Sequence, residues 1–268
     1  MRVVALLATY NEERFVGDCI GHLAENDVET YLIDNGSEDG TVDVAERFRG
    51  QGLAGVEIVP RDGVYSWKPL LDRKAELATT LEADWFIHLD ADEIRLPPAG
   101  FKTLRSALQA AAEAGFNAVN FQELTFVPTV EDPDHDHPRY RETMRHYYPF
   151  LPRPLDRLNA WKRQEIPVDL SATGGHRVSF PGLRVCPQAF PMRHYLFLSV
   201  EHATRKFVDR AYDQAELDAG MHRRRASLRR NSITLLSQRQ LRYAASDADL
   251  DETDPWTSHP LFSAPSRD

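Results

Sequence analysis

Three carboxylates stand together at one point of the chain, and together they have the chemistry to hold a cation. Asp90, Asp92 and Glu93 directly follow the mainly apolar run 85–89. Side chains two apart on an extended segment point the same way, so Asp90 and Asp92 are able to converge on one object. Crowded carboxylates need a cation or a proton to offset their repulsion, and a divalent metal that holds a phosphate group is the natural candidate. A solvated acidic turn is the alternative, and this cluster alone leaves both interpretations open.

The elements that must position this cluster alternate between strand and helix. A short apolar run with aromatic and β-branched members predicts a buried strand, and apolar residues at helical spacing predict a helix. The inner stripe of the helix at 69–83, for example, contains Leu70, Lys74 and Leu77. On this basis we expect strands at 3–9, 30–34, 56–59 and 85–89, and helices at 12–25, from 41 to about 50, and 69–83.

Such alternation predicts a parallel sheet with helices on both faces and right-handed crossovers. Open sheets of this kind bind their ligands outside the carboxyl ends of the strands. Residues 9–11, 34–37 and 90–93 each follow one of the expected strands, so we expect them at one edge of the sheet. Three loops then deliver polar groups to one crevice, which is typical of a nucleotide site.

Beyond residue 95 the pattern is less regular. A run of arginines lies between 223 and 230. It predicts either a solvated helix face or a surface that meets an anionic acceptor or an anionic membrane, and both remain open. The expected elements here are a helix at 102–114, a strand at 117–127, an irregular stretch at 128–160, helices at 199–219 and 222–245, and weak order in the acidic tail from 246.

Composition excludes several classes of function. The 268 residues carry a formal net charge of -9, so nucleic acid is not expected as a general partner. No stretch approaches the roughly 18 apolar residues of a membrane span, and we interpret the apolar start as a first strand rather than a signal peptide. Two cysteines, Cys19 and Cys186, form no disulfide framework or zinc site, which favours a reducing, cytoplasmic setting.

Three motifs, each after an expected strand, resemble those of the family 2 glycosyltransferases. They are Thr9-Tyr10-Asn11-Glu12-Glu13, the segment 33–41, and Leu89-Asp90-Ala91-Asp92-Glu93. The resemblance is good over 1–95 and thinner to about 210. It implies an α/β glycosyltransferase-A fold with a mostly parallel central sheet flanked by helices, and we expect a C-terminal helical extension. We expect a catalytic domain at 1–198 (nucleotide-binding part about 1–95, acceptor part about 96–198), a helical appendix at 199–245 and a tail at 246–268.

The resemblance also implies an activity. Family members transfer a sugar from a nucleotide diphosphate donor to an acceptor hydroxyl, usually with inversion and with Mg or Mn. We therefore expect a glycan or other hydroxyl compound as acceptor, in bacterial polysaccharide or glycoconjugate synthesis, by a cytoplasmic protein that works free or at the inner face of the membrane. The implied nucleotide-binding residues are Thr9, Asn11, Glu12, Asp34, Arg73, Asp90 and Lys206, and the implied metal ligands are Asp92 and His194.

The catalytic base is the least determined part of the motif pattern. The family often has a Glu-Asp pair followed by a Gln-x-x-Arg-Trp segment, and neither is found here. Glu165 and Asp169 lie in the corresponding zone, and either is a candidate base. A non-catalytic protein that binds sugar nucleotides is therefore the rival. A nucleotidyltransferase is disfavoured, because it requires a glycine-rich, basic loop where residues 10–13 are acidic.

Overall fold

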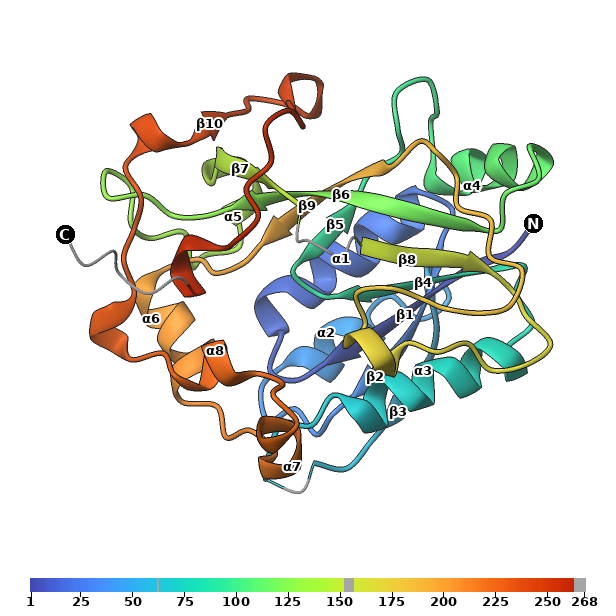
Figure 1. Ribbon diagram of the computed structural model, residues 1–268, viewed down its shortest axis with the longest axis horizontal. Helices are drawn as coiled ribbons and strands as arrows, with labels where there is room; N and C mark the ends of the chain where they lie inside the picture. Colours follow the sequence, from blue (N-terminus) through green and yellow to red (C-terminus); the bar gives the residue numbers. More distant parts are fainter. Residues whose placement is uncertain (62, 152–156, 263–268) are drawn as a thin grey trace. The chain divides into compact units, whose positions relative to one another are not determined.

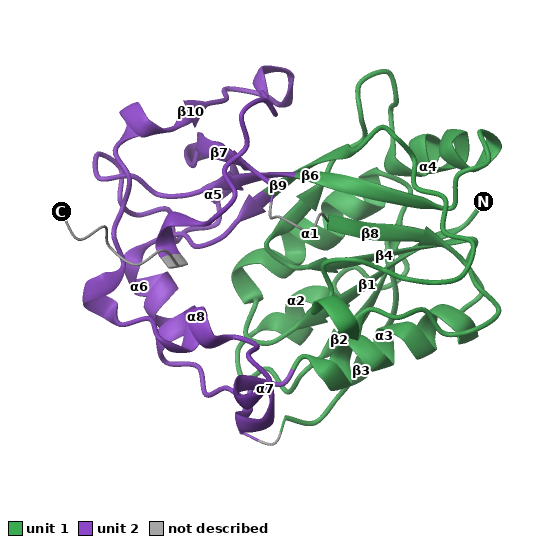
Figure 2. Ribbon diagram, in the orientation of Figure 1, with its two compact units in different colours: residues 1–61, 67–122, 154–193 green, residues 62–66, 123–153, 194–268 purple. Residues whose placement is uncertain are grey.

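The computed structural model describes residues 1–61, 63–151 and 157–262. Within it the chain forms two compact units, which are coloured separately in Figure 2. Unit 1 comprises residues 1–61, 67–122 and 154–193, and unit 2 comprises 62–66, 123–153 and 194–268. The units interleave along the chain, whereas the predicted domain boundaries are consecutive. Each unit is described here by itself.

Unit 1 contains the predicted parallel strands. β1 lies between β2 and β4, and β3 lies on the other side of β2, all parallel (Figure 1). Their apolar runs make them central strands, because both faces of such a sheet are covered. The strands are β1 (Val3–Thr9), β2 (Glu29–Asp34), β3 (Leu53–Ile58) and β4 (Trp85–Asp90), and the helices between them are α1 (Glu13–Glu25), α2 (Thr41–Glu46) and α3 (Lys68–Thr80).

The helices of unit 1 bury one face each, as their apolar spacing predicts. The apolar stripe of α3 packs with Val4, Leu6 and Phe86 of the sheet. Gly17 of α1 comes close to Val44 of α2, so these helices pack against each other. α1 and α3 have 13 residues each, and among the described residues no helix is long and apolar enough to cross a bilayer.

The sheet of unit 1 is mixed, so the prediction of a mostly parallel sheet is wrong. Two later strands continue it: β8 pairs antiparallel with β4, and β6 pairs antiparallel with β8. The order of the strands along the chain did not predict the antiparallel pairing, because the paired strands are distant in sequence. The remaining elements are β5 (Glu93–Arg95), α4 (Leu104–Glu113), β6 (Ala118–Phe126), β8 (Arg157–Lys162), a 3₁₀ turn (Ser171–Thr173) and β9 (Phe190–Tyr195), which pairs with β5.

Unit 2 contains the rest of β6, from Glu123, with β7 antiparallel beside it and β10 antiparallel beside β7. The segment around them is made of short helices and turns. Its elements are α5 (Tyr140–Thr143), β7 (His146–Phe150), α6 (Val200–Ala203), a π-helical turn (Thr204–Val208), α7 (Gln214–Asp218), α8 (Arg223–Ala226), β10 (Arg242–Tyr243) and 3₁₀ turns at Arg230–Ser232, Gln238–Gln240, Asp247–Asp249 and Pro260–Phe262.

The two long helices predicted at 199–219 and 222–245 are therefore wrong. Ser199 does cap a helix, since its side chain accepts a hydrogen bond from His202 N. That helix ends in the π-helical turn, and Asp213 caps a new one by accepting from Glu216 N. A side-chain oxygen that satisfies amide groups at a helix start is a favourable local alternative to a continuous helix. A prediction that uses apolar spacing alone and ignores such caps makes these helices too long.

The acidic tail is more ordered than expected from its composition. The ring of Trp256 stacks on Tyr148 of β7, with centroids 4.5 Å apart. His259 stacks on Phe150 of the same strand at 3.7 Å, and its Nδ1 lies 2.8 Å from the Tyr148 hydroxyl. Two aromatic contacts of this kind offset the entropy lost when the segment is fixed. Residues 263–268 lie outside the described part of the chain.

Candidate functional site

The strand register brings the three polar motifs of unit 1 to one edge. Thr9 of β1 is level with Asp34 of β2, and Ala8 is level with Asp90 of β4. All three strands are parallel, so these residues end their strands at the same height. The predicted convergence of the motifs at the carboxyl edge of the sheet is confirmed.

The Asp34 carboxylate organises the loop that follows β2. Its Oδ1 accepts hydrogen bonds from Thr9 Oγ1 at 3.1 Å and from Ser37 Oγ at 2.5 Å, and its Oδ2 accepts from Ser37 N at 2.8 Å. The residue is 1% exposed. An ionised carboxylate only accepts hydrogen bonds, and three donors satisfy it in a buried position. Asp34 therefore fixes the shape of the loop at the edge of the sheet.

Replacing Asp34 with alanine should lower the free energy of unfolding by about 2 kcal/mol, because Thr9 Oγ1 and the Ser37 donors lose a buried acceptor. Asp34→Asn keeps the size and one acceptor oxygen, and it should cost less. Urea denaturation of both variants measures the difference. An alanine variant as stable as the parent protein would show that these hydrogen bonds contribute nothing.

The loop after β1 is fastened to the loop after β2. Asn11 has a left-handed backbone with φ +54°, its N–H donates to Ser37 Oγ at 2.9 Å, and its side-chain oxygen accepts from Glu38 N at 2.8 Å. Glu12 N donates to Thr41 Oγ1 at 2.8 Å. The N-terminal cap position of α1 is Glu12, which makes no side-chain capping bond. The nucleotide contacts expected of Thr9, Asn11 and Glu12 stay predictions.

Arg61 is a cation at this edge that none of the sequence motifs indicated. The guanidinium of Arg61, just past β3, lies 3.7 Å from the centre of the Tyr10 ring. A cation stacked on an aromatic face is held in place without losing its charge. Because Arg61 closely follows the third parallel strand, its position in the sequence could have indicated that it lies at this edge.

The acidic cluster forms a turn between two strands. β4 ends at Asp90, Ala91 and Asp92 make the turn, and β5 begins at Glu93. Asp90 is exposed, whereas Asp92 is 5% exposed and Glu93 is 4% exposed. The expectation of one extended segment through these residues is therefore wrong. The solvated-turn interpretation does not fit either, because two of the three acids are buried.

Buried cations lie behind this turn. Glu93 pairs with Arg95 at 2.7 Å, and Arg95 is fully buried. Lys74 of α3 is 1% exposed, and its Nζ lies 2.8 Å from His88 Nδ1. Burial lowers the pKa of Lys74 to about 8, although the charges of Asp90 and Glu93 oppose that shift. Burial also lowers the pKa of His88 well below its usual value, so His88 is the neutral acceptor of the pair.

Arg73 faces away from this cluster, although it was the residue of α3 expected to contact the donor. Its guanidinium forms ion pairs with Glu57 at 2.8 Å and with Glu76 at 3.0 Å. These hydrogen bonds, first of all those to Glu57, raise its pKa. The donor contact of Arg73 stays a prediction, but its charge is already engaged by two carboxylates.

The acidic turn fits a metal that shares its coordination with a ligand. Among the described residues no group of three or more His, Cys, Asp or Glu side chains is arranged to hold a metal ion. A site of one or two carboxylates completed by substrate phosphates is, however, the usual form for Mg²⁺. Asp92, with Asp90 two residues away, supplies such hard oxygen donors. The residues present therefore fit a metal–diphosphate site and not a preformed metal cage.

The two candidate bases occupy different places in unit 1. Lys162, at the end of β8, pairs with Trp85 at the start of β4, so Glu165 lies beyond the edge opposite to Asp90. Glu165 is exposed there, and this placement does not support it as the base. Asp169 Oδ1 accepts from Ala172 N at 3.0 Å. Ser171 in this turn donates a hydrogen bond to Asp72 of α3, and α3 begins at the carboxyl edge of the sheet.

His194 and Lys206 lie in unit 2. His194 Nδ1 donates to the fully buried carboxylate of Glu123 at 2.6 Å, and Thr125 Oγ1 donates to the same oxygen at 2.9 Å. A carboxylate partner fixes the proton of His194 on Nδ1, which leaves Nε2 as the nitrogen of metal-ligand character. Lys206 lies in the π-helical turn, with Nζ 5.7 Å from the centre of the Phe207 ring. The metal role of His194 and the nucleotide role of Lys206 stay predictions.

Replacing Glu123 with alanine should destabilise the protein by about 2 kcal/mol, because His194 Nδ1 and Thr125 Oγ1 lose a buried acceptor. Glu142→Ala is the control. Glu142 is an acid of the same unit whose side chain is 59% exposed in a surface pair with Arg139, and its loss should change stability by less than about 0.5 kcal/mol. Chemical denaturation compares the two. Equal stability of both variants would contradict a structural role for the Glu123 contacts.

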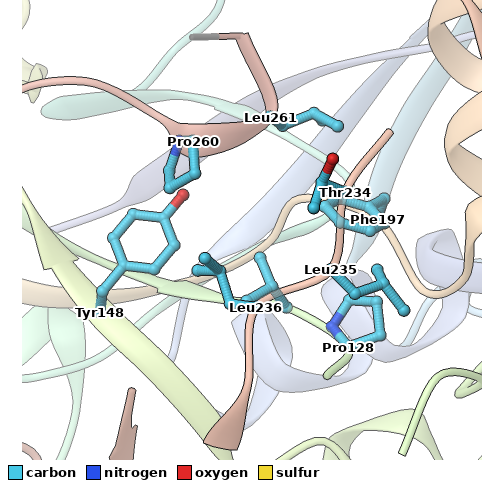
Figure 3. Close-up of a pocket in the computed structure, with 9 residues that line it drawn as sticks. Pro128, Tyr148, Phe197, Thr234, Leu235, Leu236, Pro260 and Leu261 are labelled. Atoms are coloured by element: carbon cyan, nitrogen blue, oxygen red, sulfur yellow. The ribbon is translucent and has the colours of Figure 1, made fainter. Parts of the chain in front are cut away.

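A small apolar pocket lies elsewhere in unit 2 (Figure 3). Leu235, Leu236 and Leu261 line it together with the ring of Tyr148. Its volume is about 10 Å³, which is the room that a single water needs. None of its lining residues carries a charge, so it is not suited to a sugar nucleotide.

The chain is similar to solved glycosyltransferase structures. TarS residues 1–349 of S. aureus with UDP-GlcNAc is 14% identical, with a TM-score of 0.43 over 81% of this chain and 70% of that one. A mannosyltransferase from Pyrobaculum calidifontis with GDP-Man and Mn²⁺ is 22% identical, with a TM-score of 0.35 over 44% and 34%. Glucosyl-3-phosphoglycerate synthase from Mycobacterium tuberculosis with Mg²⁺ and UDP is 21% identical, with a TM-score of 0.32 over 46% and 43%.

The family assignment rests on a sequence comparison. No match to a curated protein sequence was found. The family model described as glycosyl transferase family 2 matches residues 5–150, which is more than half of the chain. That range contains β2, β4, most of β1 and all three polar motifs at the ends of these strands. The chain belongs to glycosyl transferase family 2.

Proposed function

We propose that this protein transfers a sugar, with inversion, from a nucleoside diphosphate donor to an acceptor hydroxyl, and that it uses Mg²⁺ or Mn²⁺. The observation that carries the proposal is the register, in which Thr9 is level with Asp34 and Asp90 is level with Ala8, one residue before Thr9, at one sheet edge. A glycan or other hydroxyl compound of bacterial polysaccharide or glycoconjugate synthesis is the proposed acceptor. Family membership alone supports that last point.

The residues of unit 1 divide the binding task. The Asp34 loop is held rigid by Thr9 and Ser37, which suits it to receive the nucleoside. Asp90 is proposed to contact the ribose or the metal, and Asp92 to supply an oxygen ligand to the metal. When bound, the divalent cation neutralises the charge that develops on the departing diphosphate. Arg61, stacked on Tyr10 near this edge, is proposed as a further positive charge for the diphosphate.

The acceptor hydroxyl must lose its proton as it attacks, and a carboxylate is the suitable base. Of the two candidates we retain Asp169. Its turn is linked to the N-terminal half of α3, because Ser171 Oγ donates to Asp72 Oδ1 at 3.1 Å. Glu165 is not carried forward, because it lies beyond the opposite edge of the sheet. The metal role of His194 and the nucleotide role of Lys206 stay expectations from the family resemblance.

Incubation with a panel of sugar nucleotides and a bacterial glycan extract tests the proposal. Release of nucleoside diphosphate should depend on Mn²⁺ or Mg²⁺ and stop with EDTA. Asp169→Asn should abolish the release, and Glu165→Gln should leave it unchanged. Donor binding without release from any member of the panel would favour a non-catalytic sugar-nucleotide-binding protein instead.

A further inference from the structure

The backbone just before the acidic turn is paired with a strand on one side. β1 pairs with β4 as far as Asp90, whereas the pairing of β8 with β4 covers Trp85 to Ile87. The carbonyl groups of His88 and Leu89 lead directly into Asp90. A buried peptide group without a hydrogen bond is costly, so side-chain contacts to these carbonyls stabilise the stretch. Buried charged side chains make such contacts.

Arg95 holds the first of these carbonyls. Its Nη2 donates to His88 O at 3.1 Å and to Glu93 Oε2 at 2.7 Å. The same nitrogen lies 3.3 Å from Asn159 Oδ1, and the guanidinium stacks on Phe121 at 4.3 Å. A planar guanidinium with several fixed contacts has little freedom to move. The position of His88 O is therefore set by a side chain that is itself locked.

Lys74 holds the second carbonyl. Its Nζ donates to Leu89 O at 3.2 Å and to His88 Nδ1 at 2.8 Å. The ammonium group is fully buried, which is unfavourable for a charge in the absence of compensation. The nearby carboxylates of Asp90 and Glu93 supply that compensation. Lys74 is thus tied electrostatically to the residues of the acidic turn.

Glu93 closes the arrangement from the other side of the turn. Its Oε2 accepts from Arg95 and also from Asp90 N at 3.2 Å. One carboxylate oxygen therefore connects a buried cation to the peptide group of Asp90. The backbone from residue 88 to 90 is held at three successive points by side chains that are at most 4% exposed.

We propose that Lys74, Glu93 and Arg95 are positioning residues that fix the turn Asp90–Asp92 in the conformation that binds a metal–diphosphate. The inference rests on the proposed function. It reassigns the functional cation of α3 from Arg73, which pairs with surface carboxylates, to its neighbour Lys74. None of the three residues is assigned a contact with substrate.

Binding of Mn²⁺ with nucleoside diphosphates to Lys74→Met tests this role, with Lys102→Met, at an exposed lysine of the same unit, as the matched control. Removing a residue that orients a metal ligand typically weakens metal binding by about 10- to 100-fold. We therefore expect Lys74→Met to weaken the Mn²⁺-dependent affinity at least about tenfold, and Lys102→Met to change it less than about twofold. The Mn²⁺ signal in electron paramagnetic resonance measures this, and calorimetry in EDTA measures the metal-independent affinity, which should not change.

Arg95→Lys is the second variant, because it keeps the charge but not the fork that reaches His88 O and Glu93 together. It should weaken Mn²⁺-dependent binding by a similar factor. If Lys74→Met does not fold, Arg95→Lys alone tests the positioning role. Affinities within twofold of the parent protein overturn the inference and leave the proposed function intact. Equal losses with Mn²⁺ and in EDTA, or failure of both variants to fold, also overturn it in favour of a general structural role. Failure of the parent protein to bind any member of the panel refutes the proposed function itself.

Discussion

Replacing Asp92 with asparagine should remove the metal-dependent part of nucleotide binding and lower sugar transfer roughly a thousandfold. The variant keeps the size of the side chain but loses the charged oxygen that a hard cation prefers. A bound cation contributes several kcal/mol to stabilising the departing diphosphate, which corresponds to a factor of this size in rate. Calorimetry with a nucleoside diphosphate, with and without Mn²⁺, measures the binding part.

Asp43→Asn is the matched control for this experiment. Asp43 is an exposed acid on α2 in the same unit, so its loss changes net charge by the same amount away from the acidic turn. The control should bind and transfer like the parent protein. If Asp92→Asn retains Mn²⁺-dependent binding, the acidic turn is not the metal site.

The stability of the protein should rise with pH between about 8 and 10.5 because of Lys74. Its pKa is about 8 in the folded protein, against an ordinary value of 10.5 for lysine. In this range the unfolded chain binds more protons than the folded one, so the free energy of unfolding increases as the pH rises. A shift of this size corresponds to about 3 kcal/mol in all, lost again as the pH falls back through 8.

Comparison with Lys74→Met isolates this contribution, since tyrosines with raised pKa values are common to both proteins. The difference in the free energy of unfolding, parent minus variant, should increase by about 3 kcal/mol from pH 7 to 10.5. Arg73→Met should show no such pH dependence relative to the parent. A flat difference for Lys74→Met would mean that Lys74 keeps an ordinary pKa when folded.

The parallel half of unit 1 could be predicted because its signals are local. Each strand is a short apolar run, each helix has an apolar stripe, and their alternation predicts that the strands are parallel. The edge shared by Asp34 and Asp90 follows from that parallel arrangement. Lys74 could also have been found, because helical spacing placed it on the inner stripe with Leu70 and Leu77. A charged residue on a buried stripe was the signal.

The rest depends on contacts between residues distant in sequence. Arg230 forms an ion pair with Glu201 at 2.7 Å, and no local pattern predicts that pairing. The side-chain cap at Asp213 ended a helix that apolar spacing alone extended. Trp256 stacks on Tyr148, more than a hundred residues earlier, although the composition of the tail favours weak order. Likewise, no local pattern in the sequences of β6 and β8 predicts which strands they pair with.

Thermal unfolding with a panel of nucleoside diphosphates, each with and without Mn²⁺, tests the central claim most directly. A ligand at about a hundred times its dissociation constant stabilises the folded state by about 2.7 kcal/mol. For a chain of this size that corresponds to a rise in Tm of roughly 5–10 °C. At least one nucleoside diphosphate should produce this rise, and only when Mn²⁺ is present. No shift with any member of the panel at millimolar concentration would contradict a metal-dependent nucleotide site at the edge formed by Thr9, Asp34 and Asp90.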